Sequence, residues 1–404
     1  MTRGTSRGYL TPAPIVELTQ ALRQLGAPCE LVLPNGEVLS FGHGAAEFRI
    51  AVRNKLPLTR PLTDLSLAQA YVDGDIDVEG NLMALLGLRD MLHFAISLSQ
   101  VARVGAELLI PATIANARAI EHHYSLGDDF YLTFLDRTYH FYSQCLFRSE
   151  DETLEEAAEN KVQSMCSALD LQPGMRLLDI GGGWGGLAAF GGEHGVHVTS
   201  LTLTHESADY IRRRTATLNV PADVLVEDIL DHYPRRPYDH AVIFGVIEHI
   251  PNYRRFCERV WAALRPGGRL YLDASATREK YAASAFAREY TWHGPHSCLA
   301  VQDIIQELLF HGFDVLEVRR ETRDYELTMG HWAKRFDDAH RYVADRWSES
   351  VYRAFRVFLW GGTHGFRTNR LQAYTVIAER RPDAGPRPGN LRRMGHFVAS
   401  ALSR

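Results

Sequence analysis

Residues Arg176–Gly186 read RLLDIGGGWGG, and this stretch decides how the rest of the chain is interpreted. Its apolar beginning is typical of a buried parallel strand, and the glycines that follow let the backbone turn sharply and approach a ligand closely. Gly181, Gly183 and Gly186 satisfy the pattern Gly-x-Gly-x-x-Gly, which by itself also fits nicotinamide and flavin sites. The stretch predicts a bound cofactor, with a structural turn that holds no ligand as the simpler alternative.

The position of the acidic residue distinguishes between these cofactors. A dinucleotide site needs a carboxylate at the tip of the second strand to hold the ribose. The second predicted strand, Val198–Thr204, ends without one, and the acid is instead Asp179, two residues before the first glycine. A carboxylate at that place suits a ligand with an ammonium group and a sulfonium. The sequence therefore predicts S-adenosylmethionine (SAM).

Length and composition restrict the class of protein. A chain of 404 residues is too long for one compact core, so two domains are expected. The formal net charge of -5 argues against nucleic acid as a partner. Neither a signal segment nor a run long enough to span a membrane is recognised, and no metal site is expected. Scattered cysteines without a Cys-x-x-Cys pair favour a reducing cytoplasm. They are Cys29, Cys145, Cys166, Cys257 and Cys298.

Residues 1–90 are predicted to form a small N-terminal α+β domain. A helix is expected near Ile15–Leu25, and alternating residues around Asn35-Gly36 predict a β-hairpin. The acidic segment Ala70–Gly80 is interpreted as a surface turn, with a calcium-binding loop as the alternative. Residues 91–120 are predicted to form an amphipathic linker helix, and resting on a lipid surface is a second interpretation of it.

Residues 121–381 are predicted to form the cofactor domain. Strands and helices alternate there, which is typical of a doubly wound parallel sheet. Ligands of such sheets bind beyond the carboxyl ends of the strands. Gly181, Thr202, Asp228 and Glu248 all lie at or just beyond the carboxyl ends of predicted strands, so we expect them around one crevice.

Three further segments carry a distinctive composition. Residues 122–161 are rich in aromatic residues, which indicates either core packing or a pocket lid. The insertion 330–370 is helical in pattern and aromatic, and we expect it to form a helical cap. Residues 382–404 form a basic tail, for which solvated disorder and attraction to lipid headgroups are the two interpretations.

Four segments together carry a resemblance to a known family. They are His123–Tyr131, Leu178–Gly186, Glu248-His249 and Asp324–Met329. With these segments, the chain from about Tyr71 to Arg380 resembles the cyclopropane-fatty-acyl-phospholipid synthases and the mycolic acid cyclopropane synthases and methyltransferases. The resemblance implies a class I SAM-methyltransferase fold, which is Rossmann-like. It also implies SAM as methyl donor and a cis-alkene in a lipid acyl chain as acceptor.

The resemblance further implies roles for individual residues. Those near the cofactor are Tyr142, Ser143, Gly181, Gly183, Thr202 and Leu203, to which the strand pattern adds Asp179 and Asp228. Those at the reacting centre are Glu248 and Tyr325. Methyl transfer to an alkene leaves a carbocation, which anionic Glu248 and the aromatic faces of Tyr142, Tyr325 or Trp332 would stabilise. Proton loss from the new methyl closes a cyclopropane, whereas loss from the neighbouring carbon leaves a methyl-branched chain.

The chain departs from the family pattern where the family holds a bicarbonate as base. Gln144 stands in place of the family's Cys, and Asp273 stands in place of its His. Cys145 supplies the thiol only if the register slips by one residue. A second carboxylate beside Glu248 repels bicarbonate, which makes its use doubtful. The hypothesis is therefore that Asp273, or a water it holds, takes the proton, and both products stay open.

The sequence thus predicts a SAM-dependent C-methyltransferase that acts on an unsaturated fatty acyl chain. The expected partners are phospholipid acyl chains at the bilayer surface, reached from the cytoplasm by a protein peripheral to the inner membrane. The resemblance also allows a homodimer. The alternatives are a C-methyltransferase for another unsaturated metabolite and a lipid-binding homologue with an altered catalytic site.

Overall fold

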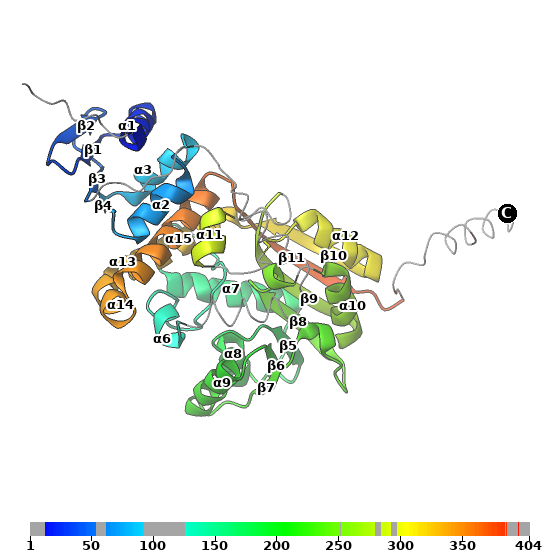
Figure 1. Cartoon of the computed structure of the whole chain (residues 1–404). Coiled ribbons are helices and arrows are strands. Elements are labelled where there is room, and N and C mark those ends of the chain that lie inside the picture. The colour runs from blue at the N-terminus through cyan, green and yellow to red at the C-terminus, as the bar shows by residue number, and fades with distance from the viewer. Residues whose placement is uncertain are drawn as a thin grey trace, which may run out of the picture. The chain divides into compact units, whose positions relative to one another are not determined.

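A computed structural model of the chain divides into two compact units (Figure 1). The structure describes residues 13–53, 62–92, 126–250, 252–278, 284–291 and 297–383, and the single residues 385 and 395. The first unit comprises Met1–Leu109, Ser284–His293 and Ala333–His364. The second comprises Ile110–Ala283, Gly294–Trp332 and Gly365–Arg404.

The first unit contains a four-stranded sheet with the strand order β2-β1-β3-β4. Strand β1 (Cys29–Val32) pairs antiparallel with β2 (Val38–Phe41) and parallel with β3 (Phe48–Val52). Strand β3 pairs antiparallel with β4 (Ile76–Gly80). The predicted hairpin is confirmed, and Gly36 takes a φ of 83° in its turn, a conformation that favours glycine.

Some of the helices of the first unit begin after a residue whose side chain caps them. Helix α1 (Ala13–Leu25) confirms the predicted helix and buries its apolar face in the core of the unit. Helix α2 (Asp64–Val72) begins after Thr63, whose side chain accepts the N–H of Ser66 in a capping box. The other described helices here are α3 (Leu82–Leu86), the 3-10 helix η1 (Gly87–Asp90), α11 (Ala285–Tyr290) and α14 (His340–Arg346).

The acidic segment Ala70–Gly80 contains the predicted turn at residues 73–75, but most of the segment is regular secondary structure. It contains the end of α2 and the whole of strand β4. Ile76 is buried and Val78 packs against the same core, so the alternating apolar residues of this segment form a strand at the edge of the sheet. The alternation of apolar residues was not recognised in the sequence because glycines and carboxylates stand between them.

The second unit contains a seven-stranded sheet with the order β10-β11-β9-β8-β5-β6-β7. Five strands run parallel: β5 (Arg176–Ile180), β6 (His197–Thr202), β7 (Asp223–Val226), β8 (Tyr238–Phe244) and β9 (Leu264–Ala276). Strand β11 (Gln372–Arg380) lies between β9 and β10 (Phe313–Arg320) and pairs antiparallel with both. The predicted α/β fold class is confirmed, with this antiparallel pair as an addition.

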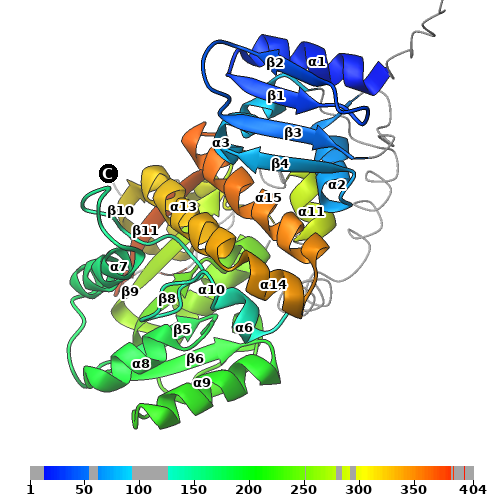
Figure 2. The ribbon, with the colours of Figure 1, turned by 90° about the vertical axis from the view of Figure 1, so that its left-hand side faces the viewer.

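Helices connect the parallel strands of the second unit (Figure 2). Helices α8 (Gly186–Glu193) and α9 (His205–Thr217) contact each other, as do α10 (Tyr253–Ala263) and α12 (Val301–His311). Helix α7 (Leu154–Leu169) packs on β9. The short helices are α6 (Asp128–Tyr131) and the 3-10 helices η2 (Ile229–Asp231) and η3 (Ile247–His249).

Two long helices, α13 (Thr322–Asp338) and α15 (Glu349–Arg367), occupy most of the predicted insertion 330–370. Its role as a cap and the boundaries of the predicted domains stay predictions. Nearly all of the predicted linker helix 91–120 and of the basic tail 382–404 lies outside the described residues. Within the part of the chain that the structure describes, no helix is both long enough and apolar enough to cross a membrane.

Candidate active site

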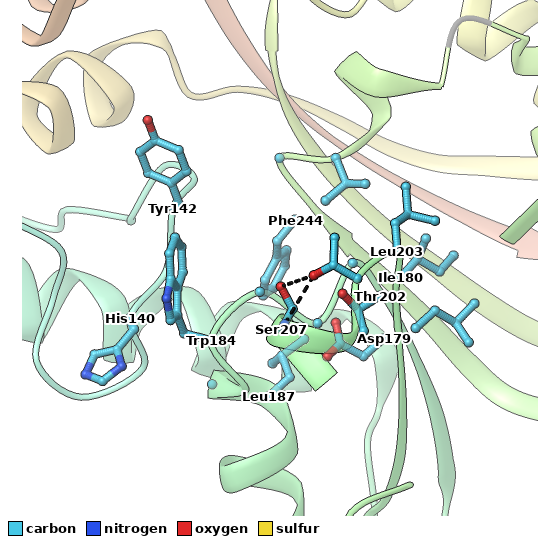
Figure 3. A pocket seen from close by; sticks show the side chains of 18 of the residues that line it. His140, Tyr142, Asp179, Ile180, Trp184, Leu187, Thr202, Leu203, Ser207 and Phe244 are labelled. Atoms are coloured by element: carbon cyan, nitrogen blue, oxygen red, sulfur yellow. Dashed lines mark hydrogen bonds between the residues drawn. The ribbon is translucent and has the colours of Figure 1, made fainter. Parts of the chain in front are cut away.

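A cavity of about 720 Å³ lies in the second unit at the carboxyl ends of β5, β6 and β8 (Figure 3). This is the edge at which open α/β sheets bind ligands. All of the residues predicted near the cofactor line it: Tyr142, Ser143, Asp179, Gly181, Gly183, Thr202, Leu203 and Asp228. In Figure 3, Tyr142 and Trp184 lie on one side of the cavity, and Asp179, Thr202 and Leu203 lie on the other.

The glycine loop after β5 lines this cavity. Larger residues do not fit at two of its positions. Gly181 has a φ of 86°, and a Cβ built on it would lie 2.5 Å from the Cγ2 atom of Val246. A Cβ on Gly186 would lie 2.4 Å from the carbonyl oxygen of Tyr139. The loop therefore exposes backbone to the cavity at a distance that only glycine permits.

The Asp179 carboxylate lies buried at the cavity. From the sequence, it is expected to favour a cationic ligand there. Burial raises its pKa to about 6, and the hydrogen bond that Ser200 Oγ donates at 2.7 Å opposes this shift. A cationic group in the cavity would stabilise the ionised form. Asp228, after β7, accepts the N–H of Leu230 at 2.8 Å, and burial also raises its pKa.

Asp136 shapes the loop that supplies Tyr142 and Ser143. Its carboxylate accepts backbone N–H groups from Tyr139 at 2.6 Å and from Phe141 at 2.7 Å, and also those of Thr138 and His140. The guanidinium of Arg214 donates to the carbonyl oxygens of Tyr139 and Trp184 at 3.2 and 2.7 Å. Sequence reasoning missed both residues, because their partners are backbone groups that leave no motif.

A continuous group of aromatic rings extends away from the cavity wall. The ring of Tyr142 lies 6.1 Å from that of Trp184 and 5.3 Å from that of Trp332. Trp332 meets Tyr325 edge to face at 6.2 Å, and Tyr325 stacks on Phe366 at 4.4 Å. The rings therefore place the three predicted aromatic residues, Tyr142, Tyr325 and Trp332, in one apolar cluster, with faces suited to a nearby cation.

Glu248 lies in η3, next to cavity-lining residues but not itself among them. Its Oε1 accepts two hydrogen bonds of 2.8 Å from Ser275, one from the backbone N–H and one from Oγ. Its Oε2 is buried and has no hydrogen-bond partner among the described residues. Burial raises the pKa of Glu248 to about 7, and burial and the charge of Glu248 both raise that of Tyr325. Sequence reasoning did not identify Ser275.

The Asp273 carboxylate is occupied by partners at both oxygens. Its Oδ1 accepts the N–H of Gly245 at 2.9 Å, and its Oδ2 lies 2.7 Å from Nζ of Lys161. Both side chains of this ion pair are 1 % exposed. Lys161 also donates to Ser143 Oγ at 2.5 Å and lies 3.8 Å from the ring centre of Phe244. Burial raises the pKa of Asp273 to about 6, and Lys161 opposes the shift.

The ion pair with Lys161 was not expected from the sequence, and the hypothesis that Asp273 or a water it holds takes the proton stays a prediction. The pair forms because Lys161, which the sequence analysis missed, lies on the buried face of α7 opposite Asp273. A signal was available in the sequence. Lys161 stands among Ala157, Ala158 and Val162 on the apolar face of α7, where an unpaired ammonium is too costly to bury.

Gln144 lies fully buried beside a second carboxylate. Its Nε2 donates to Oε2 of Glu321 at 3.2 Å, and Thr375 Oγ1 donates to the same oxygen at 2.7 Å. The Oε1 of Gln144 has no hydrogen-bond partner in the described part of the chain. Its neighbour Cys145 is also buried, its backbone N–H bonds to Thr328, and burial raises the pKa of its thiol.

The fold and the cavity define a class I SAM-dependent methyltransferase. Residues 112–376 match the family model described as mycolic acid cyclopropane synthetase, which covers more than half of the chain. The chain belongs to this family, and the resemblance identified from the sequence is confirmed. Residues 18–89 match a second model, described as a domain of unknown function.

Curated proteins and solved structures agree with this assignment. The chain is 29% identical over 360 residues to the cyclopropane-fatty-acyl-phospholipid synthase of Escherichia coli K12, covering 85% of this chain and 91% of that protein. It is 27% identical over 384 residues to a protein of Pseudomonas putida named a probable fatty acid methyltransferase, covering 90% and 95%. The structure of the cyclopropane synthase MmaA2 from Mycobacterium tuberculosis matches with a TM-score of 0.60 and 26% identity, covering 65% and 98%.

Proposed function

We propose that this enzyme transfers the methyl carbon of SAM to the cis double bond of an unsaturated fatty acyl chain, and that the chain belongs to a membrane phospholipid. The observation that carries the proposal is the single cavity lined by all of the predicted cofactor residues, next to the aromatic cluster and Glu248. The product is a cyclopropane or a methyl-branched chain.

The residues of the cavity fit SAM. A volume of about 720 Å³ lies within the range of small-molecule sites, which is about 300 to 1,000 Å³. The glycine loop at Gly181 and Gly183 offers close backbone approach, and Asp179 and Asp228 offer carboxylates for an amino group and a ribose. When bound, SAM supplies an electrophilic methyl group on a sulfonium.

The surroundings of the cavity suit the cation that this chemistry produces on the acyl chain. The aromatic faces of Tyr142, Trp332 and Tyr325 stabilise positive charge while they exclude water. Glu248 adds a formal negative charge in a buried place, where electrostatic stabilisation is stronger than in water. The alkene is a weak nucleophile, so holding it in line with the sulfonium methyl contributes most of the remaining acceleration.

The lipid acceptor is supported by the names of the relatives, which describe fatty acids and fatty acyl phospholipids. We further propose that the enzyme works as a peripheral protein at the inner membrane surface, and that a homodimer forms. Sedimentation with vesicles of unsaturated phospholipid and the molar mass in solution test these two points separately.

The function is tested by feeding a host that expresses the chain with methionine whose methyl group carries three deuterium atoms. Extracted lipids are then analysed by mass spectrometry with fragmentation, against the host without the chain. A cyclopropane retains two deuterium atoms and resists mild hydrogenation, whereas a methyl-branched alkene retains three and hydrogenates to a simple branch.

Two other outcomes would contradict the proposal. Label in a soluble product but not in lipid would indicate a C-methyltransferase for another metabolite. SAM binding without transfer to any lipid or metabolite would indicate a lipid-binding homologue. Label in free fatty acid, with none in phospholipid, would correct only the acceptor.

A further inference from the structure

Buried carboxylates near the reacting centre influence one another, and their partners differ. Burial raises the pKa values of Glu248 and Asp273; the charge of Asp273 adds to the shift of Glu248, and the charge of Glu321 adds to that of Asp273. Asp273 is paired with Lys161 at 2.7 Å, and Glu321 is paired with Arg319 at 3.2 Å. Within the described ranges, no cation is paired with Glu248.

The oxygens of these carboxylates are also used differently. Asp273 has a partner at each oxygen, and so has Glu321. Glu248 has Oε1 fixed by both donors of Ser275, whereas its buried Oε2 has neither a hydrogen bond nor an ion pair within the described part of the chain. A buried acceptor left without a partner is costly, so one that is retained needs an explanation.

We propose that Glu248 is itself the base of the reaction, and that its Oε2 takes the proton from the methylated acyl chain. This inference rests on the proposed function. In the step, a C–H bond of the new methyl breaks and its electron pair forms the C–C bond that closes the ring. If the neighbouring carbon loses the proton, the pair forms a double bond instead. The cationic chain and the Glu248 carboxylate both become neutral, and the proton passes to solvent after the product leaves.

The same geometry assigns Asp273 and Lys161 a positioning role. Their ion pair holds the N–H of Gly245 and the hydroxyl of Ser143, both of which line the cavity. Because Lys161 is already paired with Asp273, it is not free to hold an external anion. A bicarbonate placed beside Glu248 would add a further negative charge to this cluster, so the chain's own carboxylate is the better base.

The inference is tested with the purified full chain, deuterated SAM and vesicles of unsaturated phospholipid in buffers with and without bicarbonate. Glu248→Gln removes the base and keeps the size of the side chain. Turnover should fall by about 10² to 10⁴-fold, the usual contribution of a general base, while SAM affinity stays near that of the wild type. Residual product should shift toward the alcohol formed by water capture, a change that a structural role would not cause.

Glu326→Gln is the matched control, because Glu326 is also buried but pairs with Arg367 away from the cavity lining. It should keep both turnover and product ratio. Wild-type turnover should not depend on bicarbonate. Full turnover in Glu248→Gln, or strong bicarbonate stimulation of the wild type, would overturn the inference and leave the proposed function standing.

If Glu248→Gln also loses SAM binding, a second variant still tests the assignment of the base. Glu248→Asp keeps a carboxylate, so the inference expects it to retain more turnover than the Gln variant. Equal loss in both variants would overturn the assignment of the base. A wild-type chain that labels no lipid would overturn the proposed function, and this inference with it.

Discussion

Replacing Lys161 by Met leaves the Asp273 carboxylate buried without its cation, and the cost of this change can be worked out. Coulomb's law gives about 6 kcal/mol for charges 2.7 Å apart at an effective dielectric constant of about 20. The unfolding free energy will not fall by that much, because Asp273 can take up a proton. With a pKa of about 6, its ionised form is favoured at pH 7 by about one pKa unit, which corresponds to roughly 1 to 2 kcal/mol.

The lost charge interaction is therefore limited to roughly 1 to 2 kcal/mol at pH 7. The hydrogen bond that Lys161 donates to Ser143 adds about 1.5 kcal/mol, as is usual for a charged donor. We expect Lys161→Met to lower the free energy of unfolding by about 3 kcal/mol at pH 7. At pH 5, where wild-type Asp273 is already protonated, the loss should shrink to about half. In the double variant with Lys161→Met and Asp273→Asn, the part of the unfolding free energy that was lost with the charge interaction should be regained at pH 7.

Urea denaturation followed by tryptophan fluorescence and circular dichroism measures these differences. Lys334→Met is the matched control, because Lys334 is exposed and its loss should change stability by less than about 0.5 kcal/mol. A loss of about 6 kcal/mol that is the same at both pH values would refute the protonation argument. Additive effects of the two substitutions would refute the ion pair itself.

Further predictions concern the cavity and the pH dependence. Gly181→Ala should weaken SAM binding at least about tenfold in calorimetry, because the strain of φ 86° and the 2.5 Å approach to Val246 displace the loop; unchanged affinity would contradict the close-approach argument. Asp136→Asn should weaken SAM binding while exposed Asp151→Asn should not, and equal affinities would show that the N–H groups do not shape the cavity. Since burial raises the pKa of Glu248 from 4.5 to about 7, turnover should rise with pH through about 7 as the base ionises, and a flat profile would argue against Glu248 as base. The contribution of this carboxyl to stability should fall as the pH rises from 4.5 to about 7.

The parts of the fold that could be predicted from the sequence are those whose signals are local. The apolar run and glycines of Arg176–Gly186 predict a strand and a turn, and the structure places β5 and the cavity there. The hairpin around Asn35-Gly36 is equally local. The antiparallel insertion of β11 between β9 and β10 could not be predicted this way, because strand order depends on contacts between distant segments.

The candidate site divides in the same manner. Residues that directly follow strands share one edge of the sheet, so their place in one cavity follows from topology. The positions of the side chains that hold these residues in place do not follow from topology. Asp136 and Arg214 act on backbone groups, and Lys161 reaches Asp273 from a helix that precedes the glycine loop. Such partners can be inferred only once the buried groups are known, because each buried charge then requires a compensating partner.

The two departures from the family pattern are each matched by a partner in this chain. The carboxylate at Asp273 is neutralised by Lys161, and the amide of Gln144 donates to Glu321. Pairing of this kind is expected of any buried carboxylate, because an unpaired one is costly and a site without a function has nothing to offset that cost. Here compensation is complete at Asp273 and Glu321, while one oxygen of Glu248 stays without a partner among the described residues. The pattern of satisfied and unsatisfied groups therefore favours a rebuilt proton-accepting site over a degraded one.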